Sequence, residues 1–226
     1  MISHWLHCSD HAELIIFFNG WGMDHHPIEP LTTESYDVLV FSNYTGLHLP
    51  EDYAQIISRY KKIYLICWSF GVWAAQQLFF NKKEQFAGCI AINGTLKPIN
   101  DDFGIPVTFF HATLKNYSKS VQERFYRRMC RQSNVYDLFM SLQPQRPIDD
   151  QRKELQSLAD MIQQNKGADS IFDEVIISSN DRIIPTINQQ AFWKEQGNIS
   201  IIDGCHFPFT NWQRWDDIVD LVRLDG

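Results

Sequence analysis

The sequence predicts an α/β fold with a mostly parallel central sheet flanked by helices. Short apolar runs recur along the chain, helix-like segments separate them, and the run at residues 14–18 is continuously apolar, as in a strand buried on both faces. Strands and helices that alternate in this way indicate βαβ units. The expected strands are residues 2–7 at an edge, 14–18, 38–41, 63–66, 87–92, 175–177 and 199–202. The expected helices between them are residues 50–60, 70–81, 186–195 and 212–224.

The alternation fails between about residues 94 and 172. Residues 106–114 fit a strand or a helix, and we favour a helix because Pro106 suits a first helical turn. Residues 118–132 and 149–166 are predicted to be helices. We expect a helical cap at about residues 104–168, inserted after the sixth strand within one domain spanning residues 1–226; an ordinary pair of surface helices is the alternative.

Length and composition restrict the class of protein. The chain has 226 residues, and no apolar run approaches the roughly 20 residues that span a bilayer. Its start lacks the basic and apolar regions of a signal peptide, so we expect a cytoplasmic protein that does not bind a membrane. Five scattered cysteines without a C-x-x-C pair indicate neither a disulfide framework nor a zinc site, and we expect no metal and no cofactor.

Charge is unevenly distributed. The net charge of −7 argues against a nucleic-acid binder, yet nine basic residues face four acidic ones between Lys115 and Lys153. A basic region on an acidic protein calls for an explanation, and a basic surface that is simply exposed to solvent is one alternative.

Residues 63–75 contain the motif around which the chain is organised. An apolar run turns at Ser69 into an alanine-rich helical stretch, as in a nucleophile elbow. An elbow needs small residues two positions before and after the nucleophile; Gly71 fits, and Cys67 replaces the usual glycine. Taken alone, the pattern equally fits a buried serine that caps the next helix.

A nucleophilic serine needs a base and a carboxylate that orients the base. Asp181 follows the expected strand at residues 175–177, and His206 follows the strand at residues 199–202. The order serine, acid, histidine is that of the α/β-hydrolase fold, and all three residues lie beyond carboxyl ends of strands, where such sheets gather ligands. We therefore predict Ser69, Asp181 and His206 as a catalytic triad.

Other residues compete for these roles. Asp173 and Asp203 are alternative acids, and His25 and His26 are alternative bases because they follow a loop that should face the site. Asp181 itself could be a turn residue or half of a surface ion pair with Arg182.

Residues 18–23 predict an oxyanion hole. Gly20 and Gly22 follow the first strongly apolar strand and would let the backbone turn inward, so we assign the two donors to the N–H groups of Trp21 and Phe70. A plain turn in which glycine supplies a positive φ is the less specific alternative.

With these residues placed, the sequence resembles the α/β-hydrolases over nearly its whole length. More narrowly, it resembles the BioG-type pimeloyl-[acyl-carrier protein] methyl ester esterases through residues 17–24, 67–72, 124–130 and 205–209; Asn19 before Gly20, and Cys67 in the elbow, point to this family. The resemblance implies hydrolysis of a methyl ester at the far end of a carrier-bound pimeloyl chain, in biotin synthesis. It implies an acyl-enzyme on Ser69 and then water activated by His206.

The resemblance also implies acyl-carrier protein, an acidic protein, as partner. On a helix Arg124, Arg127, Arg128 and Arg131 share one face and could meet carrier carboxylates or the phosphopantetheine phosphate. A solvated basic face is the alternative.

An apolar slot should bind the pimeloyl methylenes, at about 0.8 kcal/mol each. The aromatic and aliphatic candidates, most of which could equally be core residues, are Trp21, Phe110, Leu114, Phe125, Tyr126, Phe139 and Phe207. Two other functions remain open: a hydrolase or thioesterase for another acyl ester, and an inert hydrolase-like module that binds a carrier protein.

Overall fold

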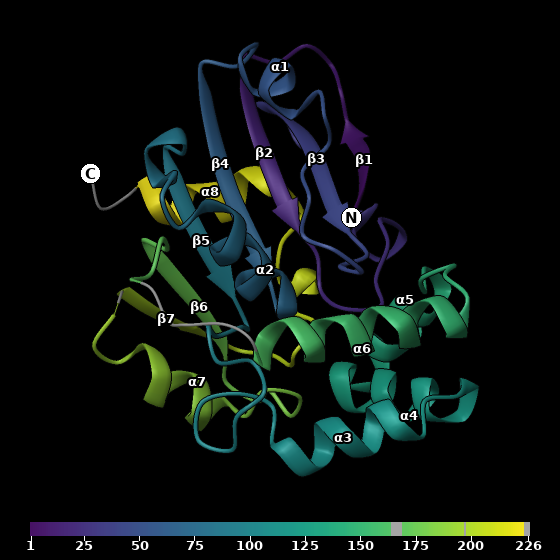
Figure 1. Cartoon of the computed structure of the whole chain (residues 1–226). Helices are drawn as coiled ribbons and strands as arrows, with labels where there is room; N and C mark the ends of the chain where they lie inside the picture. Colours follow the sequence, from purple (N-terminus) through teal and green to yellow (C-terminus); the bar gives the residue numbers. More distant parts are fainter. Residues whose placement is uncertain (164–168, 197, 224–226) are drawn as a thin grey trace.

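A single sheet forms the centre of the protein in the computed structural model, which describes residues 1–163, 169–196 and 198–223 (Figure 1). Seven strands of the described residues lie in the order β1-β3-β2-β4-β5-β6-β7. They are β1 (Ile2–His7), β2 (Glu13–Phe18), β3 (Tyr36–Ser42), β4 (Lys62–Trp68), β5 (Gly88–Ile92), β6 (Glu174–Ser178) and β7 (Asn198–Ile202). Only the β1 and β3 pair is antiparallel among these strands, so the predicted mostly parallel sheet is confirmed.

From β3 on, α-helices lie in each connection between successive strands, and one more follows β7. They are α1 (Tyr53–Ile57), α2 (Phe70–Phe79), α3 (Val107–Lys115), α4 (Lys119–Cys130), α5 (Ser133–Ser141), α6 (Ile148–Gln163), α7 (Thr186–Trp193) and α8 (Trp215–Arg223). Short 3-10 helices cover His26–Ile28, Lys83–Gln85 and Phe209–Asn211. None of the described helices is both long and apolar enough to cross a membrane.

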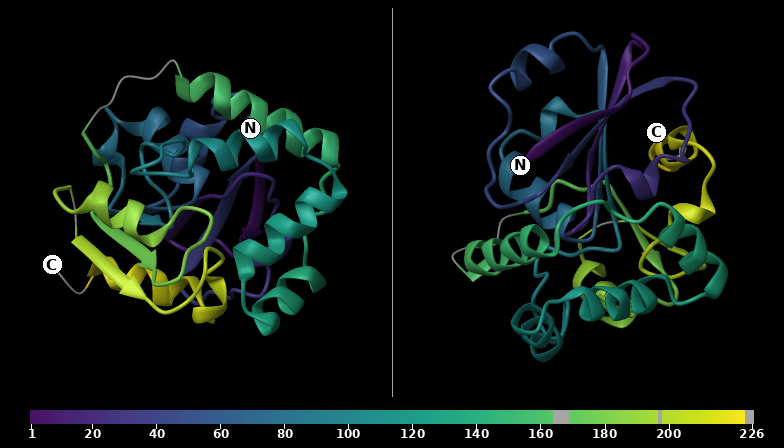
Figure 2. Two further views of the ribbon diagram at one scale, coloured as in Figure 1. Left: turned by 90° about the horizontal axis from the view of Figure 1, so that it is seen from below. Right: turned by 90° about the vertical axis from the view of Figure 1, so that its right-hand side faces the viewer.

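The central strands are buried because helices cover both faces of the sheet. Figure 2 shows α2 and α8 on opposite faces, and every residue of β3 and β5 is buried. In the middle of the sheet, Phe18 at the end of β2 lies in register with Phe41 on β3 and with Cys67 on β4. The carboxyl ends of these strands are therefore level, and the loops that follow them start side by side.

Four helices, α3 to α6, separate β5 from β6 and form what we call the helical insertion. Figure 1 shows them gathered at the end of the sheet towards which β2, β3 and β4 point. The insertion follows the fifth strand of the chain, so the expected position after the sixth strand is wrong. The last residues of the expected insertion, 164–168, lie outside the described residues.

Inside the insertion, the helix favoured after Pro106 is confirmed as α3, with Pro106 as its N-cap residue. The helix expected at residues 118–132 is shorter, because it ends at Cys130 and Arg131 has a φ of 54°. The next helix, α5, was not predicted. Its apolar residues Val135 and Phe139 are poor helix formers in isolation, and packing against α4 stabilises it.

Candidate active site

Ser69 lies on a sharp turn between β4 and α2. Its φ of 58° and ψ of −123° are rare for a residue with a side chain, as in a strained elbow. Gly71 is required here, because a Cβ atom at this position would lie 2.2 Å from the carbonyl oxygen of Phe18 and 2.6 Å from that of Asn19. The elbow is therefore packed directly against the loop that follows β2.

Cys67 is accommodated within the sheet. It is buried and lies in register with Phe18 on β2 and Ala91 on β5, so one neighbour is small. Burial raises the pKa of the Cys67 thiol well above its usual range, which keeps the sulfur neutral. A cysteine thus occupies the position of the usual glycine without carrying charge into the core.

The predicted serine, histidine and aspartate are brought together. The Ser69 Oγ lies 2.9 Å from Nε2 of His206, and Nδ1 of the same ring lies 2.6 Å from Oδ2 of Asp181. All three residues are buried. They come from the turns after β4, β6 and β7, so the parallel strands place at one edge groups that are far apart in the sequence.

Asp181 is held by its own loop. Its Oδ1 accepts the backbone N–H groups of Ile183 and Ile184 at 2.8 and 3.0 Å, and its Oδ2 accepts a hydrogen bond from the Gln189 amide at 2.8 Å. These donors stabilise the carboxylate and fix the oxygen that faces His206. The geometry suits an acid that orients a base.

The competing acids point elsewhere. Asp173 pairs with Lys83 and accepts the backbone N–H of Cys89, and Asp203 accepts the Ser179 hydroxyl. Both carboxylates are bonded to these other groups, and it is Asp181 that contacts His206.

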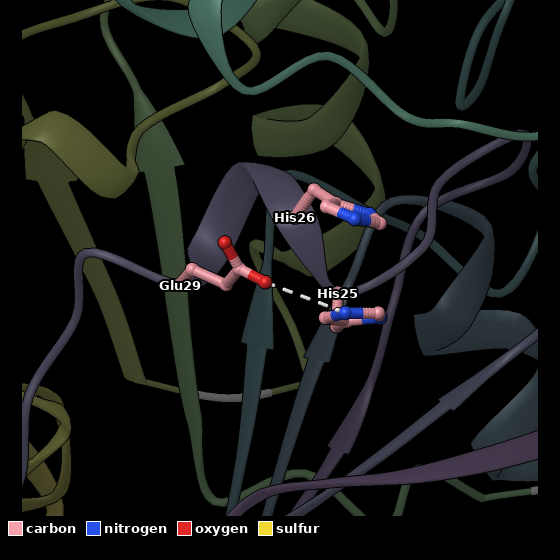
Figure 3. A group of neighbouring side chains, drawn as sticks. All are labelled: His25, His26 and Glu29. Atoms are coloured by element: carbon pink, nitrogen blue, oxygen red, sulfur yellow. Dashed lines mark ion pairs between the residues drawn. The ribbon is translucent and has the colours of Figure 1, made fainter.

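The competing bases, His25 and His26, lie beside Glu29 in a cluster of their own (Figure 3). His25 is 3.4 Å from the Glu29 carboxylate, its ring stacks on that of His26 at 4.2 Å, and it stacks on His4 at 3.7 Å. Neither His25 nor His26 lines the cavity beside Ser69.

His25, His26 and Glu29 are also the one group of described residues whose donor atoms are near enough to share a metal ion. The planes of the two rings differ by only 27°. Nitrogen lone pairs lie in the ring plane, so those of two stacked rings run alongside each other and do not converge on one ion. The arrangement does not suit a metal centre.

The two predicted oxyanion donors are free. Phe70 is the first residue of α2, so its N–H has no intrahelical acceptor. No acceptor among the described residues pairs with the backbone N–H of Trp21. Trp21 and Phe70 line the same cavity as Ser69 and His206, which is where an oxyanion would form.

A narrow apolar cavity of about 20 Å³ lies between the triad and the insertion. Three of the predicted slot residues line it: Trp21, Phe110 and Phe125. A volume of about 20 Å³ holds roughly one water molecule. Sequence reasoning missed other lining residues, among them Phe109, Met129 and Ile183.

The other four residues predicted to line the acyl slot do not line the cavity, so this part of the prediction is wrong. Tyr126 and Phe139 pack against each other at 4.8 Å, and Phe207 packs on Phe139 at 5.1 Å, in the layer that joins the insertion to the sheet. Leu114 is half-buried beside the core. Instead of lining the cavity, Tyr126 of α4 and Phe139 of α5 turn their rings towards each other.

The four arginines do not share one helical face, because α4 ends before Arg131. The Arg131 guanidinium donates to the Asn180 side chain, and Arg128 donates to the backbone carbonyl of Arg182 at 2.6 Å while lying over the Phe109 ring. Both contacts tie the end of α4 to the Asp181 loop. Arg127 is exposed and lies over the Tyr136 ring, and Arg124 is exposed beside a groove between α3 and α4.

One buried charge in the insertion was also missed. Glu154 lies on the apolar face of α6, beside Leu155 and Leu158, and its carboxylate accepts the backbone N–H of Gly22 at 3.1 Å. A charged residue at the helical spacing of Leu155 and Leu158 was the available signal in the sequence.

The chain matches the family model described as Pimeloyl-ACP methyl esterase BioG over residues 2–218. The crystal structure of BioG from Haemophilus influenzae is similar, with a TM-score of 0.87 and 31% identity over 96% of this chain and 99% of that one. A Malonyl-[acyl-carrier protein] O-methyltransferase of Bacteroides fragilis is 33% identical over 86% of this chain. The matched residues span only 39% of that relative's length.

More distant structures share the fold alone. The enol-lactonase from Burkholderia xenovorans has a TM-score of 0.64 at 14% identity, over 98% of this chain and 94% of that one. The sheet order, the insertion and these neighbours make this an α/β-hydrolase fold. Because the family model covers nearly all of the chain, the protein belongs to the BioG family of pimeloyl-ACP methyl esterases and is a carboxylic ester hydrolase.

Proposed function

We propose that this protein hydrolyses the methyl ester of pimeloyl-[acyl-carrier protein] methyl ester in biotin synthesis, with Ser69 as nucleophile, His206 as base and Asp181 as the group that orients the base. The observation that carries the proposal is the continuous chain of hydrogen bonds from Ser69 Oγ through His206 to Asp181. Membership in the BioG family supports the substrate.

In the acylation step, Ser69 Oγ attacks the ester carbonyl carbon and His206 Nε2 takes the hydroxyl proton. The tetrahedral intermediate collapses as the C–O bond to the methoxy group breaks, and His206 returns the proton to the leaving group, which departs as methanol. The product of this half-reaction is an acyl-enzyme on Ser69.

Deacylation repeats the sequence with water. His206 takes a proton from water as the oxygen attacks the acyl carbon, and the proton passes to Ser69 Oγ when the acyl–serine bond breaks. The free carboxylate of the carrier-bound pimeloyl chain is released. In both steps Asp181 keeps the ring oriented and stabilises the imidazolium.

The N–H groups of Trp21 and Phe70 stabilise the oxyanion in each intermediate. Both are free and both belong to residues beside Ser69 in the cavity. Removing one donor of this kind costs about 2.7 to 4 kcal/mol of transition-state stabilisation in a measured case.

The acyl chain enters between the triad and the insertion. The cavity is narrow, so the side chains of Phe109, Phe110 and Phe125, which form part of its wall, shift to admit a chain of several methylenes. The apolar wall then covers the chain, which excludes bulk water from the acyl-enzyme.

The carrier protein docks on the exposed part of α4. Arg124 and Arg127 are exposed and offer bidentate partners for carrier carboxylates or for the phosphate of the prosthetic group. Arg128 and Arg131 serve mainly to hold α4 to the Asp181 loop.

The test offers purified protein two substrates, the carrier-bound pimeloyl methyl ester and a short p-nitrophenyl ester, with Ser69→Ala as control. We expect hydrolysis of both, and a loss of about 10⁶-fold in kcat for the folded variant. A fluorophosphonate probe should label only the wild-type serine. Full activity of Ser69→Ala would overturn the mechanism. Hydrolysis of the small ester in preference to the carrier-bound ester would overturn the substrate. A wild type that the probe does not label would indicate an inert carrier-binding module.

A further inference from the structure

Helix α6 and Arg146, which lies two residues before it, contact the turn of residues 20–23, which we call the oxyanion turn, at three points. The Trp21 indole donates to the carbonyl oxygen of Gln151 at 2.7 Å, and the Gly22 N–H donates to Oε2 of Glu154 at 3.1 Å. The Arg146 guanidinium donates to the carbonyl of Met23 at 3.2 Å. The insertion is therefore bonded to the same turn whose Trp21 lines the cavity.

The direction of the Trp21 N–H depends on how this turn is folded. The Met23 N–H donates to the Gly20 carbonyl, at 3.4 Å, and a trans peptide points its C=O and N–H in opposite directions. Holding the Gly20 carbonyl inside the turn therefore turns the Trp21 N–H outward. Gly22 has a φ of 75°, the conformation that a type II turn needs at this position.

The central peptide of the turn, between Trp21 and Gly22, is the group that flips between a type I and a type II turn. Its N–H is the one that Glu154 accepts. In the flipped turn, the Trp21 carbonyl would take the place of the Gly22 N–H and face the Glu154 carboxylate. Repulsion between these two oxygens selects the observed turn, and the bond to Glu154 anchors the turn against the insertion, which holds Trp21 in its place beside Ser69.

Glu154 is fully buried and lines no part of the cavity. Its Oε1 accepts the Tyr44 N–H at 2.9 Å, and its Oε2 also accepts from Arg146 at 2.6 Å. Burial raises the pKa of this carboxyl, while Arg146 and the backbone donors oppose the shift. A buried ion pair is a poor source of net stability, so its presence here calls for a different role.

We propose that Glu154 is a positioning residue that holds the oxyanion turn in its productive conformation, and so makes the oxyanion hole depend on the docking of α6. The proposal rests on the proposed function, because it assigns the Trp21 N–H to the oxyanion. Glu154 itself touches no reacting atom. It acts through its hydrogen bond to the Gly22 N–H. The oxyanion hole is therefore complete only when α6 is packed against the oxyanion turn.

The variant Glu154→Gln tests this, because an amide keeps the shape but replaces one acceptor oxygen with a donor that faces N–H groups. With a short p-nitrophenyl ester, we expect kcat to fall about 10- to 100-fold and KM to change by less than about 2-fold, as for a loss confined to the transition state. A small alkyl boronic acid, which adds to Ser69 as a tetrahedral anion, should bind about 10- to 100-fold more weakly.

The matched control is Asp150→Asn. Asp150 pairs with the same Arg146 guanidinium, at 2.7 Å, but it is partly exposed and does not contact the oxyanion turn. We expect its kcat and its boronic acid affinity to match the wild type. Equal losses in Asp150→Asn and Glu154→Gln would show that the ion pair matters only for folding, and would overturn the proposal.

Unchanged kcat and boronic acid affinity in Glu154→Gln would also overturn it. If that variant does not fold, Glu154→Asp decides, because it keeps the charge that pairs with Arg146 but draws the carboxylate back from the Gly22 N–H: weaker boronic acid binding supports the proposal and unchanged binding overturns it. Failure of the proposed function has a different signature, since the wild type itself would then hydrolyse no ester and bind no boronic acid.

Discussion

The Trp68 indole Nε1 donates a 2.8 Å hydrogen bond to the backbone carbonyl of His206. The residue before the nucleophile thus holds the backbone of the base, and the two rings lie 5.5 Å apart. Asn93 donates to the same carbonyl at 3.1 Å from the end of β5. The ends of β4 and β5 therefore hold the His206 loop in position beside Ser69.

Replacing Trp68 by phenylalanine should lower kcat about 5- to 10-fold, because the loss of one buried hydrogen bond, about 1 kcal/mol, falls on the loop that carries the base. Steady-state kinetics with a small ester would measure this. The control is Trp215→Phe, since Trp215 is equally buried but its indole N–H has no partner among the described residues. An equal loss of kcat in both variants would mean that only bulk packing is affected.

Gly71→Ala should destabilise the protein by about 3 kcal/mol and remove activity, because the new Cβ atom would overlap the Phe18 carbonyl oxygen and force backbone to move. Thermal unfolding and ester hydrolysis measure the two effects. Gly46→Ala should be nearly neutral, since its Cβ atom would meet only the His48 side chain. Wild-type stability of Gly71→Ala would contradict the elbow packing described above.

Reversing the charge of Arg124 and Arg127 should raise KM for the carrier-bound ester about 10-fold while leaving a small ester unaffected, because these exposed side chains are expected to meet only the carrier. The difference between the substrates should shrink as salt is added. Arg128→Glu serves as the contrast. It also breaks the contact with Arg182, so it should impair both substrates. Equal effects of the Arg124 and Arg127 changes on both substrates would assign these arginines a structural role.

Acidification should lower the free energy of unfolding through the stacked rings of His4, His25 and His26. Burial, and then the neighbouring His4 and His26, lower the pKa of His25, while Asp24 and Glu29 oppose the shift. The unfolded chain therefore takes up a proton as the pH falls through the ordinary value of 6.5, before the folded chain does, so the free energy of unfolding decreases below that pH.

Denaturant unfolding between pH 5 and 8 would show this decrease for the wild type, and His25→Phe, which keeps a ring in the stack without a charge, should reduce it. A pH profile of His25→Phe identical to that of the wild type would contradict the prediction.

The sequence by itself determined the α/β architecture and the order of the three central site residues. Continuous apolar runs specify strands buried on both faces, and parallel strands carry their carboxyl ends to one edge. Ser69, Asp181 and His206 could therefore be selected by position, and the hydrogen-bonded chain that joins them follows from that topology. Pro106 likewise indicated a helix start, because its effect on the backbone is local.

Tertiary structure alone decided what depends on contacts between distant segments. The end of α4 before Arg131, the existence of α5 and the place of Tyr126 and Phe139 away from the cavity all follow from packing within the insertion. Glu154 shows the reason most clearly: its helical position predicts a core contact, but its partners Gly22 and Tyr44 lie 132 and 110 residues away. No local pattern encodes such a pair, because it forms only when the insertion closes on the ends of the strands.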